Sequence, residues 1–443
     1  MLTPEEDHKL EYDETGQRYH VIFSTDCSPY QHWQSYLVYF TAMKNRQPGH
    51  VTRIVSGCDP KEAIEMNKWF TEKVQFMSKR FHLHLTPKFS EVRDETGKVI
   101  GDYKFFNKPR GLKHWLEYFD LTGFNEGTGT FASADDIVIL IDPDMALMRP
   151  ITKDFSKERE TLIGTRRKAH ILSTEVKHGV PFAQTYGLGT QWQKFDLDKI
   201  AGEHSPAKDV SREEGQLYFP AGPPYIGTVK VSQVVTSKPS TLWDMYQIAV
   251  KWSEFVPLVH AQYPYLLAEM YAYCIAAAHL GLKHQLIDSL MASNPDTGGE
   301  AWPLVDKIPR EEMCEFSRDP DHEKYALPSV IHMCQRYSVG QDWFFGKRRI
   351  PHDIYECETP LFEEPPGDLA TLYDYKWPPN AKDKTMLSPK IINQETFMVC
   401  SMTRLLNDAA IFYKTAACTT TKPNMKRSRK VADLFKEREK KSL

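Results

Sequence analysis

The amino-acid sequence predicts an α/β protein with a mostly parallel central sheet flanked by helices. Between residues 19 and 141, short apolar runs alternate with segments of helical spacing, which is the pattern of parallel strands joined by helices. The most distinctive run is Ile137-Val-Ile-Leu-Ile141, because five consecutive aliphatic residues are typical of a strand buried on both faces. Beyond residue 358 the chain is rich in proline, and we expect a loosely structured C-terminal extension there.

The first half of the chain supplies the predicted strands. Apolar and β-branched residues predict strands at residues 20–24, 51–56, 82–85 and 137–141. Aromatic and aliphatic residues at helical spacing predict helices at residues 29–43, 61–79 and 108–119. Asp59-Pro60 is a typical helix start, because proline fits the first helical turn. Residues 91–101 are charged and residues 123–130 are rich in glycine, so we expect loops in both places.

The second half is predicted to be mainly irregular and helical. Residues 150–238 contain repeated Gly and Pro, and long irregular stretches of this kind are usually functional. Helices are expected at residues 242–255, 264–280 and 394–417. The predicted organisation is a flexible N-terminus (1–18), a main domain (19–358), the extension (359–421) and a disordered basic tail (422–443). In that tail nine Lys or Arg face three acidic residues.

The composition is that of a globular protein. The 443 residues are 41% hydrophobic and 12% aromatic, and the net charge of −3 gives no general attraction for nucleic acid. No run reaches the ~18 consecutive apolar residues that a membrane-spanning helix needs. The first eight residues are acidic and lack the apolar core of a signal peptide. Either the chain is cytosolic, or the sequence starts downstream of a leader or anchor.

The eight cysteines show no paired spacing of the kind found in structural zinc sites. Cys27 and Cys58 each lie just beyond a predicted strand. If these strands are parallel neighbours, ~4.8 Å apart, the two sulfurs come within reach of a disulfide. The alternative is a pair of inert buried thiols. A disulfide here would indicate an oxidising compartment.

Asp142-Pro143-Asp144 directly follows the apolar run that ends at Ile141. The carboxyl ends of strands in an open α/β sheet line the crevice where ligands bind. Two carboxylates separated by one residue at that place can hold Mg²⁺ or Mn²⁺ together with phosphate oxygens of a substrate, because these cations prefer oxygen ligands. Many nucleotide-sugar transferases grip the diphosphate of their donor in this way. The alternative is a simple Asp-Pro turn after a strand.

Five motifs occur in a fixed order between residues 19 and 360. They are Phe23-Ser-Thr-Asp-Cys27 with Tyr30-Gln-His-Trp-Gln34, Phe106-Asn-Lys-Pro109 with His114-Trp-Leu116, Ile141-Asp-Pro-Asp144 with Arg149-Pro150, Glu269-Met-Tyr-Ala272, and His332-Met-Cys-Gln-Arg-Tyr337. Together they resemble the plant and algal hydroxyproline O-arabinosyltransferases and the related peptidyl serine α-galactosyltransferases. The resemblance implies a GT-A type glycosyltransferase fold, a UDP-sugar donor, Mn²⁺ or Mg²⁺ as cofactor, and glycosylation of hydroxyproline or serine in secreted wall proteins. It also implies a location in the Golgi or endoplasmic reticulum lumen.

One position departs from the pattern of the arabinosyltransferases. They tend to have Glu-Pro-Asp-His where this chain has Asp142-Pro143-Asp144-Met145. The two acids are equivalent as metal ligands. Because the histidine is missing, the sugar stays open between arabinose and galactose.

The predicted metal ligands come from two parts of the chain. Asp144 is expected to bind the metal, and Asp142 to bind either the metal or the ribose of the donor. His332 follows the apolar run at residues 327–331. In the GT-A fold a late histidine often completes the metal shell, and imidazole is an acceptable ligand for manganese. The alternative for His332 is a core histidine that bonds to a backbone carbonyl.

The predicted donor-binding residues lie at the ends of early elements. Ser24, Thr25 and Asp26 end the first predicted strand and are expected to contact the nucleotide base. Alternatively they form a turn or helix cap before Pro29. Lys108 is expected to neutralise donor phosphate as a point charge, or else to be an ordinary solvated cation at a helix start.

Glu269 interrupts the most apolar predicted helix and is the candidate catalytic residue. Carboxylates rarely occur on such helices unless they are paired or functional. Glu269 is expected to contact the acceptor hydroxyl or to stabilise positive charge that develops on the sugar. The alternative is a structural ion pair. Gly187 and Gly222 are expected to shape the donor and acceptor pockets, because glycine lets backbone approach a sugar closely, or to make simple turns.

The expected reaction is a metal-assisted displacement of UDP by a peptide hydroxyl, with retention of the anomeric configuration. Two other classes stay open. One is an inactive sugar- or peptide-binding relative. The other is a metal-dependent phosphohydrolase in which Asp142 is the nucleophile and Asp144 a general acid. Association with a membrane, through a missing leader or the basic tail, is a further alternative.

Overall fold

A computed structural model describes residues 3–127, 130–133, 135–229, 244–318, 320–378, 382–419 and 422–433. The chain divides into two compact units, each assembled from separate segments. The first unit comprises Met1–Gln31, Arg46–Pro143 and Ile151–Asp288, and the second comprises His32–Asn45, Asp144–Pro150 and Ser289–Leu443. The domain bounds derived from the sequence stay a prediction.

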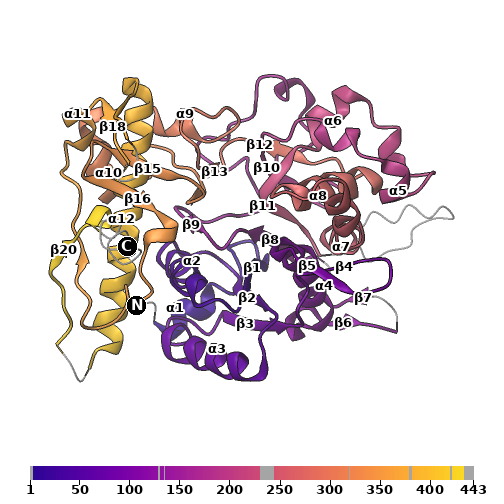
Figure 1. Cartoon of the computed structure of the whole chain (residues 1–443), viewed down its shortest axis with the longest axis horizontal. Helices are drawn as coiled ribbons and strands as arrows, with labels where there is room; N and C mark the ends of the chain where they lie inside the picture. The colour runs from indigo at the N-terminus through magenta and orange to yellow at the C-terminus, as the bar shows by residue number, and fades with distance from the viewer. Residues whose placement is uncertain are drawn as a thin grey trace. The chain divides into compact units, whose positions relative to one another are not determined.

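The first unit contains a seven-stranded sheet (Figure 1). In sheet order its strands are β12 (Gln285–Ile287), β10 (Phe182–Thr185), β11 (Ala221–Thr228), β8 (Ile137–Ile141), β1 (Tyr19–Asp26), β2 (His50–Ser56) and β3 (Phe81–Thr86). Neighbouring strands are parallel except that β11 runs antiparallel to both β8 and β10. All five residues of β8 are buried, as the aliphatic run predicted. The predicted α/β sheet is therefore confirmed, with one reversed strand.

The helices of the first unit supply a large part of its core, above all α7 and α8. They are α1 (Pro4–Lys9), α3 (Pro60–Lys73), α4 (Asn107–Tyr118), α5 (Leu197–Ala201), α6 (Arg212–Tyr218), α7 (Met245–Gln262) and α8 (Ala268–His279). Helix α4 packs against β1 and β2 and against α7, and α7 packs along α8. Leu112, Trp115 and Leu116 on α4 are completely buried, which confirms the helical spacing seen in the sequence.

Helix α3 begins as predicted but ends earlier. Asp59 accepts a hydrogen bond from the Glu62 N–H, and the Glu62 side chain accepts one from the Asp59 N–H, which completes a capping box. The helix ends at Lys73 and not near residue 79. Asp7 holds the segment that follows, accepting hydrogen bonds from the Ser78 hydroxyl (2.6 Å) and from Arg80 Nε (3.0 Å).

The prediction that residues 150–238 are irregular was wrong for two strands of the main sheet, β10 and β11. The Gly222-Pro223-Pro224 sequence resembles a turn because proline has no N–H to donate to a sheet. In the structure the pairing with β10 passes directly from Ala183 opposite Tyr225 to Gln184 opposite Gly222. The two prolines lie in this β-bulge, where no ladder hydrogen bond is needed. Residues 230–238 lie outside the described residues.

The segments predicted as charged and glycine-rich loops contain short hairpins. Strands β4 (Glu91–Arg93) and β5 (Val99–Asp102) pair antiparallel, and so do β6 (Phe124–Asn125) and β7 (Thr130–Phe131). Residues 128 and 129 lie outside the described residues. These strands are too short to show the alternation of apolar and polar residues by which a strand is predicted from the sequence.

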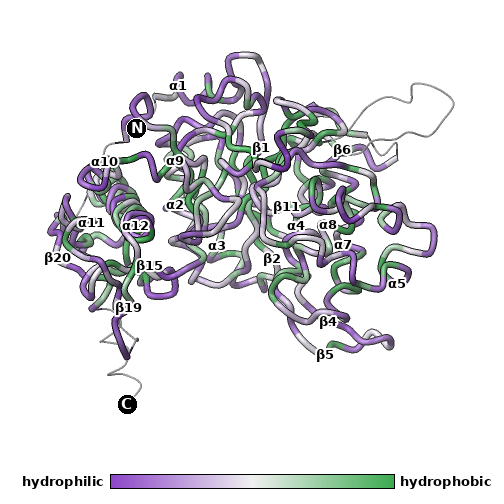
Figure 2. Tube along the Cα trace, turned by 90° about the horizontal axis from the view of Figure 1, so that it is seen from above, coloured by the Kyte–Doolittle hydropathy of each residue, from purple (hydrophilic) through white to green (hydrophobic). Residues whose placement is uncertain are grey.

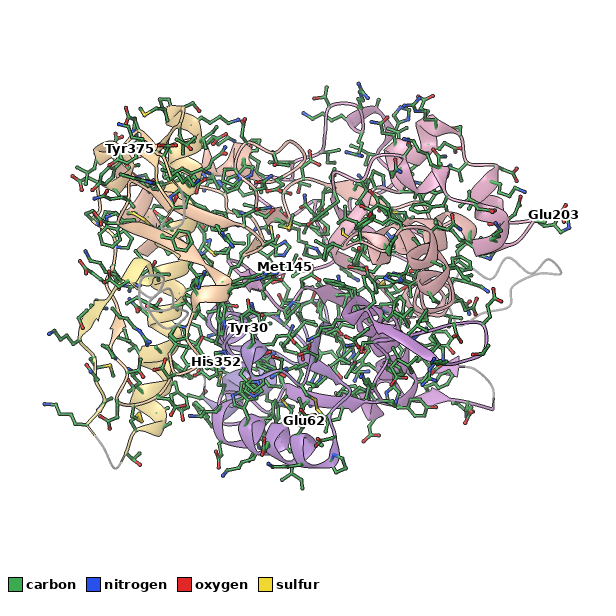
Figure 3. The ribbon with its side chains drawn as sticks, viewed as in Figure 1. Tyr30, Glu62, Met145, Glu203, His352 and Tyr375 are labelled. Atoms are coloured by element: carbon green, nitrogen blue, oxygen red, sulfur yellow. A yellow bond between two sulfur atoms is a disulfide. The ribbon has the colours of Figure 1, made fainter. Side chains whose placement is uncertain are left out.

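The second unit contains a three-stranded sheet in the order β13 (Met291–Ala292), β14 (Val330–His332), β9 (Met145–Leu147). Its helices are α2 (His32–Lys44), α9 (Trp302–Val305), α10 (Met313–Arg318), α11 (Leu369–Leu372) and α12 (Pro389–Ala417). Its remaining strands are β15 (Arg336–Val339), β16 (Trp343–Gly346), β17 (Leu361–Phe362), β18 (Tyr375–Lys376), β19 (Thr385–Met386) and β20 (Arg427–Arg429). Met145 is completely buried and lies among other side chains in Figure 3.

Helix α12 is the central helix of the second unit. It packs against α2, α10, β15 and β16, and hydrophobic and hydrophilic residues are mixed along it in Figure 2, as expected of a helix with a buried side. Disulfides join Cys314 to Cys400 on α12, and Cys357 to Cys418 just beyond its end. In the predicted tail, strand β20 pairs with β17, and residues 434–443 lie outside the described residues. No described helix combines the length and apolar character needed to cross a bilayer.

Candidate active site

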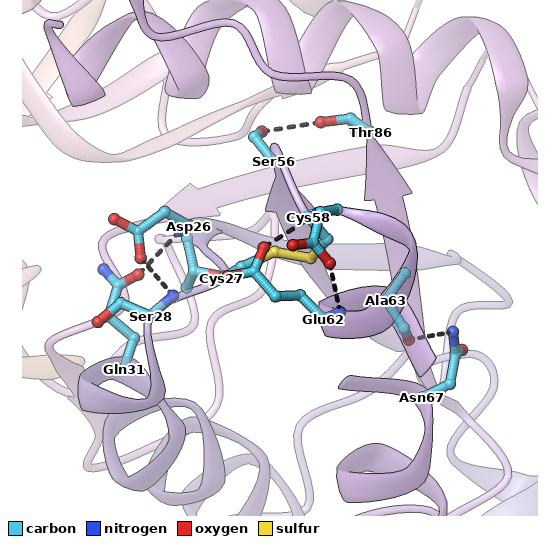
Figure 4. The surroundings of a disulfide bond; sticks show 12 residues. Asp26, Cys27, Ser28, Gln31, Ser56, Cys58, Glu62, Ala63, Asn67 and Thr86 are labelled. Atoms are coloured by element: carbon cyan, nitrogen blue, oxygen red, sulfur yellow. Dashed lines mark hydrogen bonds between the residues drawn. A yellow bond between two sulfur atoms is a disulfide. The ribbon is translucent and has the colours of Figure 1, made fainter. Parts of the chain in front are cut away.

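The carboxyl ends of β1 and β2 are joined by a disulfide between Cys27 and Cys58, with a Cα–Cα distance of 5.4 Å (Figure 4). This confirms the predicted bond, which followed from the parallel pairing of the two strands. Asp26 is fixed beside it, because its Oδ1 accepts from the Ser28 N–H (2.8 Å) and its Oδ2 pairs with Lys104 Nζ (2.6 Å). The carboxylate therefore closes a turn and holds a cation.

Ser24 and Thr25 differ in how they are placed. Thr25 is buried, and its hydroxyl donates to the Ile54 carbonyl (3.3 Å) and accepts from Arg53 Nε (2.9 Å). Ser24 is only partly buried, and its hydroxyl lies 3.7 Å from the position that a Cβ would take at Gly111 on α4. Glycine at that position lets α4 approach the ends of β1 and β2. The nucleotide-binding role of Ser24, Thr25 and Asp26 stays a prediction.

Three predicted site residues of the first unit form one buried ionic cluster. Lys108 Nζ on α4 lies 2.8 Å from Asp142 Oδ1, at the end of β8, and 2.6 Å from Glu269 Oε1 on α8. The side chains of Lys108 and Glu269 are 11% and 4% exposed. Sequence reasoning selected each residue separately, with a structural ion pair as the alternative for Glu269. The structure shows that pair and identifies Lys108 as the partner.

Burial and charge act in opposite directions on this cluster. Burial alone would lower the pKa of Lys108, but the carboxylates of Asp142 and Glu269 outweigh it and raise the pKa above its ordinary value. Burial raises the pKa of Glu269, the Lys108 charge opposes this, and Asp142 adds to it. Lys108 therefore stays protonated, while Glu269 takes up a proton more readily than an exposed glutamate.

Asp144 and His332 lie together in the second unit. Strand β14 pairs with β9 so that His332 is opposite Met145, and His332 Nε2 is 3.3 Å from Asp144 Oδ1. The ammonium of Lys347 forms an ion pair with the other oxygen, Asp144 Oδ2. Burial alone would raise the pKa of Asp144, but His332 and Lys347 outweigh it and hold the pKa well below its ordinary value. Asp144 is therefore ionised at neutral pH.

A hydrogen-bonded loop supports His332 from behind. The Tyr337 hydroxyl lies 2.9 Å from the His332 carbonyl and 2.7 Å from the Ser293 carbonyl. The buried carboxylate of Glu300 accepts from the Ser293 N–H (2.6 Å), the Ser293 hydroxyl (2.7 Å) and the Asn294 N–H (3.0 Å). Sequence reasoning missed Lys347 and Glu300. The aspartates that follow the predicted strand at residues 137–141 marked the place of the site. Lys347 and Glu300 themselves belong to no recognisable motif.

Asp144 and His332 of the second unit offer a carboxylate oxygen and an imidazole nitrogen side by side, and Asp142 precedes Asp144 by two residues. Only Pro143 separates the two aspartates, so the chain itself keeps their carboxylates close. Carboxylate oxygens and an imidazole nitrogen suit Mn²⁺ or Mg²⁺. Because Asp144 is held ionised and already faces a cationic partner, the donor set fits a divalent cation.

The two predicted pocket glycines have different surroundings. Gly187 is exposed in the turn after β10, and a Cβ there would meet no atom within 4 Å. Gly222 lies in β11, and a Cβ there would lie 2.2 Å from the ring of Tyr186. Glycine at position 222 is therefore explained by the packing of Tyr186. Their roles in substrate pockets stay predictions.

Comparison with known proteins supports the resemblance seen in the motifs. No protein-family profile matches the sequence. Peptidyl serine alpha-galactosyltransferase from Arabidopsis thaliana is 26% identical to this chain over 374 residues, which cover 80% of this chain and 35% of that protein. The predicted resemblance is confirmed. This chain thus spans about a third of the length of that curated relative.

Two solved structures are also similar to the chain. They are the bifunctional glycosyltransferase WbbM in its apo form, with 9% identity, a TM-score of 0.33 and coverage of 72% of this chain and 46% of that chain, and the glycosyltransferase GlyE from Streptococcus pneumoniae TIGR4, with 8% identity, a TM-score of 0.28 and coverage of 93% of this chain and 66% of that chain.

Proposed function

We propose that this chain is a metal-dependent glycosyltransferase of GT-A type. It transfers galactose or arabinose from a UDP-sugar to the hydroxyl of serine or hydroxyproline in a peptide. The observation that carries the proposal is Asp142-Pro143-Asp144 at the end of a buried central strand in a chain similar to a peptidyl serine α-galactosyltransferase. The mixed α/β sheet, with the predicted site residues Asp26 and Asp142 at the carboxyl ends of β1 and β8, agrees with this assignment.

The residues divide the work of the proposed reaction. Asp142, Asp144 and His332 would hold the cation, which would supply Lewis-acid chemistry at the donor diphosphate. Glu269 is the catalytic carboxylate, and it faces the acceptor hydroxyl or the sugar ring. Lys108 holds Glu269 and Asp142 in place through its two ion pairs. The group predicted to bind the nucleotide is Ser24, Thr25 and Asp26.

The stereochemical course and the substrates belong to the same proposal. Retention is proposed from the family resemblance, with front-face attack by the acceptor hydroxyl on the anomeric carbon as UDP leaves and with Glu269 as the carboxylate beside the reacting groups. The histidine typical of arabinosyltransferases is replaced by Met145, whose side chain is completely buried and contributes no ligand nitrogen. Galactose is therefore the first donor sugar to test, and arabinose the second.

The proposed compartment is the oxidising lumen of the secretory pathway. Three disulfides support it, Cys27–Cys58, Cys314–Cys400 and Cys357–Cys418, because disulfides persist in oxidising environments. Cys274 and Cys334 are free thiols. The proposed acceptors, secreted wall-type glycoproteins, pass through that compartment.

The test is a screen of UDP-sugars against serine- and hydroxyproline-containing peptides with Mn²⁺, with the products identified by mass spectrometry. We expect transfer by the wild type and its loss in Asp144→Ala, together with loss of Mn²⁺ binding. The matched control is Glu203→Ala, since Glu203 is exposed and projects at the edge of the molecule in Figure 3. Normal transfer by Asp144→Ala would refute the metal assignment. No transfer from any donor would refute the function.

A further inference from the structure

The second carboxylate oxygen of Glu269 has an unusual environment. Oε1 accepts a hydrogen bond from Lys108, whereas Oε2 has no hydrogen-bond partner among the described residues, although Glu269 is only 3% exposed. Buried polar atoms are almost always paired, because an unpaired acceptor loses its water without compensation. An unpaired carboxylate oxygen beside a candidate active site therefore indicates a ligand that donates a hydrogen bond.

A second unpaired group lies on the strand beside it. The Tyr225 hydroxyl on β11 has no partner among the described residues, and Tyr225 is completely buried. Its ring stacks on Tyr273 with 4.0 Å between centroids. Tyr273 is four residues after Glu269 on α8, so both project from the same helix face. Tyr225 therefore lies over the part of α8 that carries Glu269.

Two further observations bring the Tyr225 hydroxyl close to the ionic cluster. In the sheet Tyr225 is opposite Leu140, two residues before Asp142. Burial and then the charge of Glu269 raise the pKa of Tyr225, with a smaller contribution from Asp142. Because side chains alternate along a strand, the register puts Tyr225 on the same face of the sheet as Leu140 and Asp142.

The charge of the cluster selects the kind of ligand. Lys108 carries one positive charge between two carboxylates, and its ammonium is engaged by both of them. With two carboxylates and one ammonium, the cluster favours a neutral hydrogen-bond donor at Glu269 Oε2 over a phosphate group. A neutral hydroxyl fits better, because it can donate to a carboxylate oxygen and also bond to a phenol, which both donates and accepts.

We propose that Glu269 Oε2 and the Tyr225 hydroxyl bind one hydroxyl group of the monosaccharide in the donor. This site rests on the proposed function, which supplies the UDP-sugar. It assigns Glu269 to the donor sugar and not to the acceptor hydroxyl. Lys108 is a positioning residue, since it holds Oε1 and so presents Oε2 to the sugar.

The experiment compares the affinities of the full chain for UDP and for UDP-galactose, measured by calorimetry with Mn²⁺ and without acceptor. We expect UDP-galactose to bind more tightly than UDP. In Tyr225→Phe that preference should fall about tenfold, the effect of one buried hydrogen bond, while the affinity for UDP is unchanged. Glu269→Gln should lower the preference as well. UDP-arabinose replaces UDP-galactose if it is the tighter ligand.

Tyr273→Phe is the matched control. It removes a phenol oxygen from the same stacked pair, but this hydroxyl already bonds to His284 Nε2 at 2.8 Å. We expect it to keep the preference for UDP-galactose and to lower the stability of the unliganded protein. Tyr225→Phe should not lower that stability, because it removes a hydroxyl that lacks a partner in the protein.

The outcomes separate this site from the proposed function. Equal affinities for UDP and UDP-sugars in the wild type, or full preference in Tyr225→Phe, would overturn the site and leave only a buried water at these atoms. A preference that depends on Tyr225, without transfer to any peptide, would support the site and refute the transferase. Absence of UDP binding would overturn both.

Discussion

The ionic cluster of Lys108, Asp142 and Glu269 can be tested by removing its single cation. In Lys108→Met the two carboxylates would stay buried and face each other without a counter-charge. Their side chains are 17% and 4% exposed, and both now lie within 2.8 Å of the ammonium. Breaking a buried ion pair by removing one partner costs about 3–5 kcal/mol. We expect the free energy of unfolding, measured by urea denaturation followed by tryptophan fluorescence, to fall by that amount.

Two further variants make this expectation specific. Glu269→Gln leaves Lys108 paired with Asp142, removes a like charge and keeps an oxygen that can accept from Lys108, so it should lower stability by less than Lys108→Met does. Lys108→Met combined with Glu269→Gln should regain part of the loss, because only one unpaired carboxylate remains. The control is Lys113→Met on the same helix, whose pair with Glu117 is 37% exposed on the lysine side and is worth about 0.3–0.5 kcal/mol. If Lys108→Met costs no more than Lys113→Met, the cluster is solvated and the reasoning is wrong.

Three other predictions follow from the described contacts. Burial lowers the pKa of His50 to about 3 and of His82 and His84 to about 4, against an ordinary 6.5. The unfolded chain therefore binds more protons than the folded one below pH 6.5, and stability should fall as the pH drops from 6.5 to 4, by up to about 1.4 kcal/mol per pH unit for each histidine. Denaturation at several pH values checks this, and a flat profile, or one unchanged by His82→Gln, contradicts it. The double variant Cys314→Ser/Cys400→Ser lacks a link across 86 residues, and its free energy of unfolding should be about 2–4 kcal/mol lower than that of the wild type. Reduction should then destabilise the wild type more than the double variant. Equal losses on reduction would contradict a formed bond. Lys347→Met removes the ammonium that competes for Asp144 and should tighten Mn²⁺ binding roughly tenfold, or about 1–2 kcal/mol; weaker binding in a calorimetric titration would show that Lys347 supports the site.

The features that the sequence predicted well are those with a local signal. Strand β8 is a continuous aliphatic run, α3 starts at an Asp-Pro cap, and α4 carries apolar residues at helical spacing. The disulfide between Cys27 and Cys58 followed from two such strands and their parallel pairing. Each of these predictions uses residues that are neighbours in the chain, or one simple rule for packing strands.

The features that it did not predict depend on pairing between distant segments. Strand β11 contains two prolines and is central in the sheet only because a bulge removes the need for their N–H groups. Lys347 reaches Asp144 across 203 positions of sequence, and no motif marks it. Lys108 and Glu269 were each recognised, but not their contact, because a charged residue gives no sign of which opposite charge it will meet.

Asp142 and Asp144 show that a motif of only two acidic residues can be informative. Each aspartate has its own lysine, Lys108 for Asp142 and Lys347 for Asp144. If the pair only made a turn after β8, as the alternative reading had it, neither carboxylate would need a buried counter-ion, because an exposed turn acid is solvated by water. Asp144 and Lys108 are buried, whereas Asp142 and Lys347 are partly buried, and removing such charges from water is costly unless they are used. That cost favours the metal-binding reading over the turn, and loss of Mn²⁺ binding in Asp144→Ala is the result that it requires.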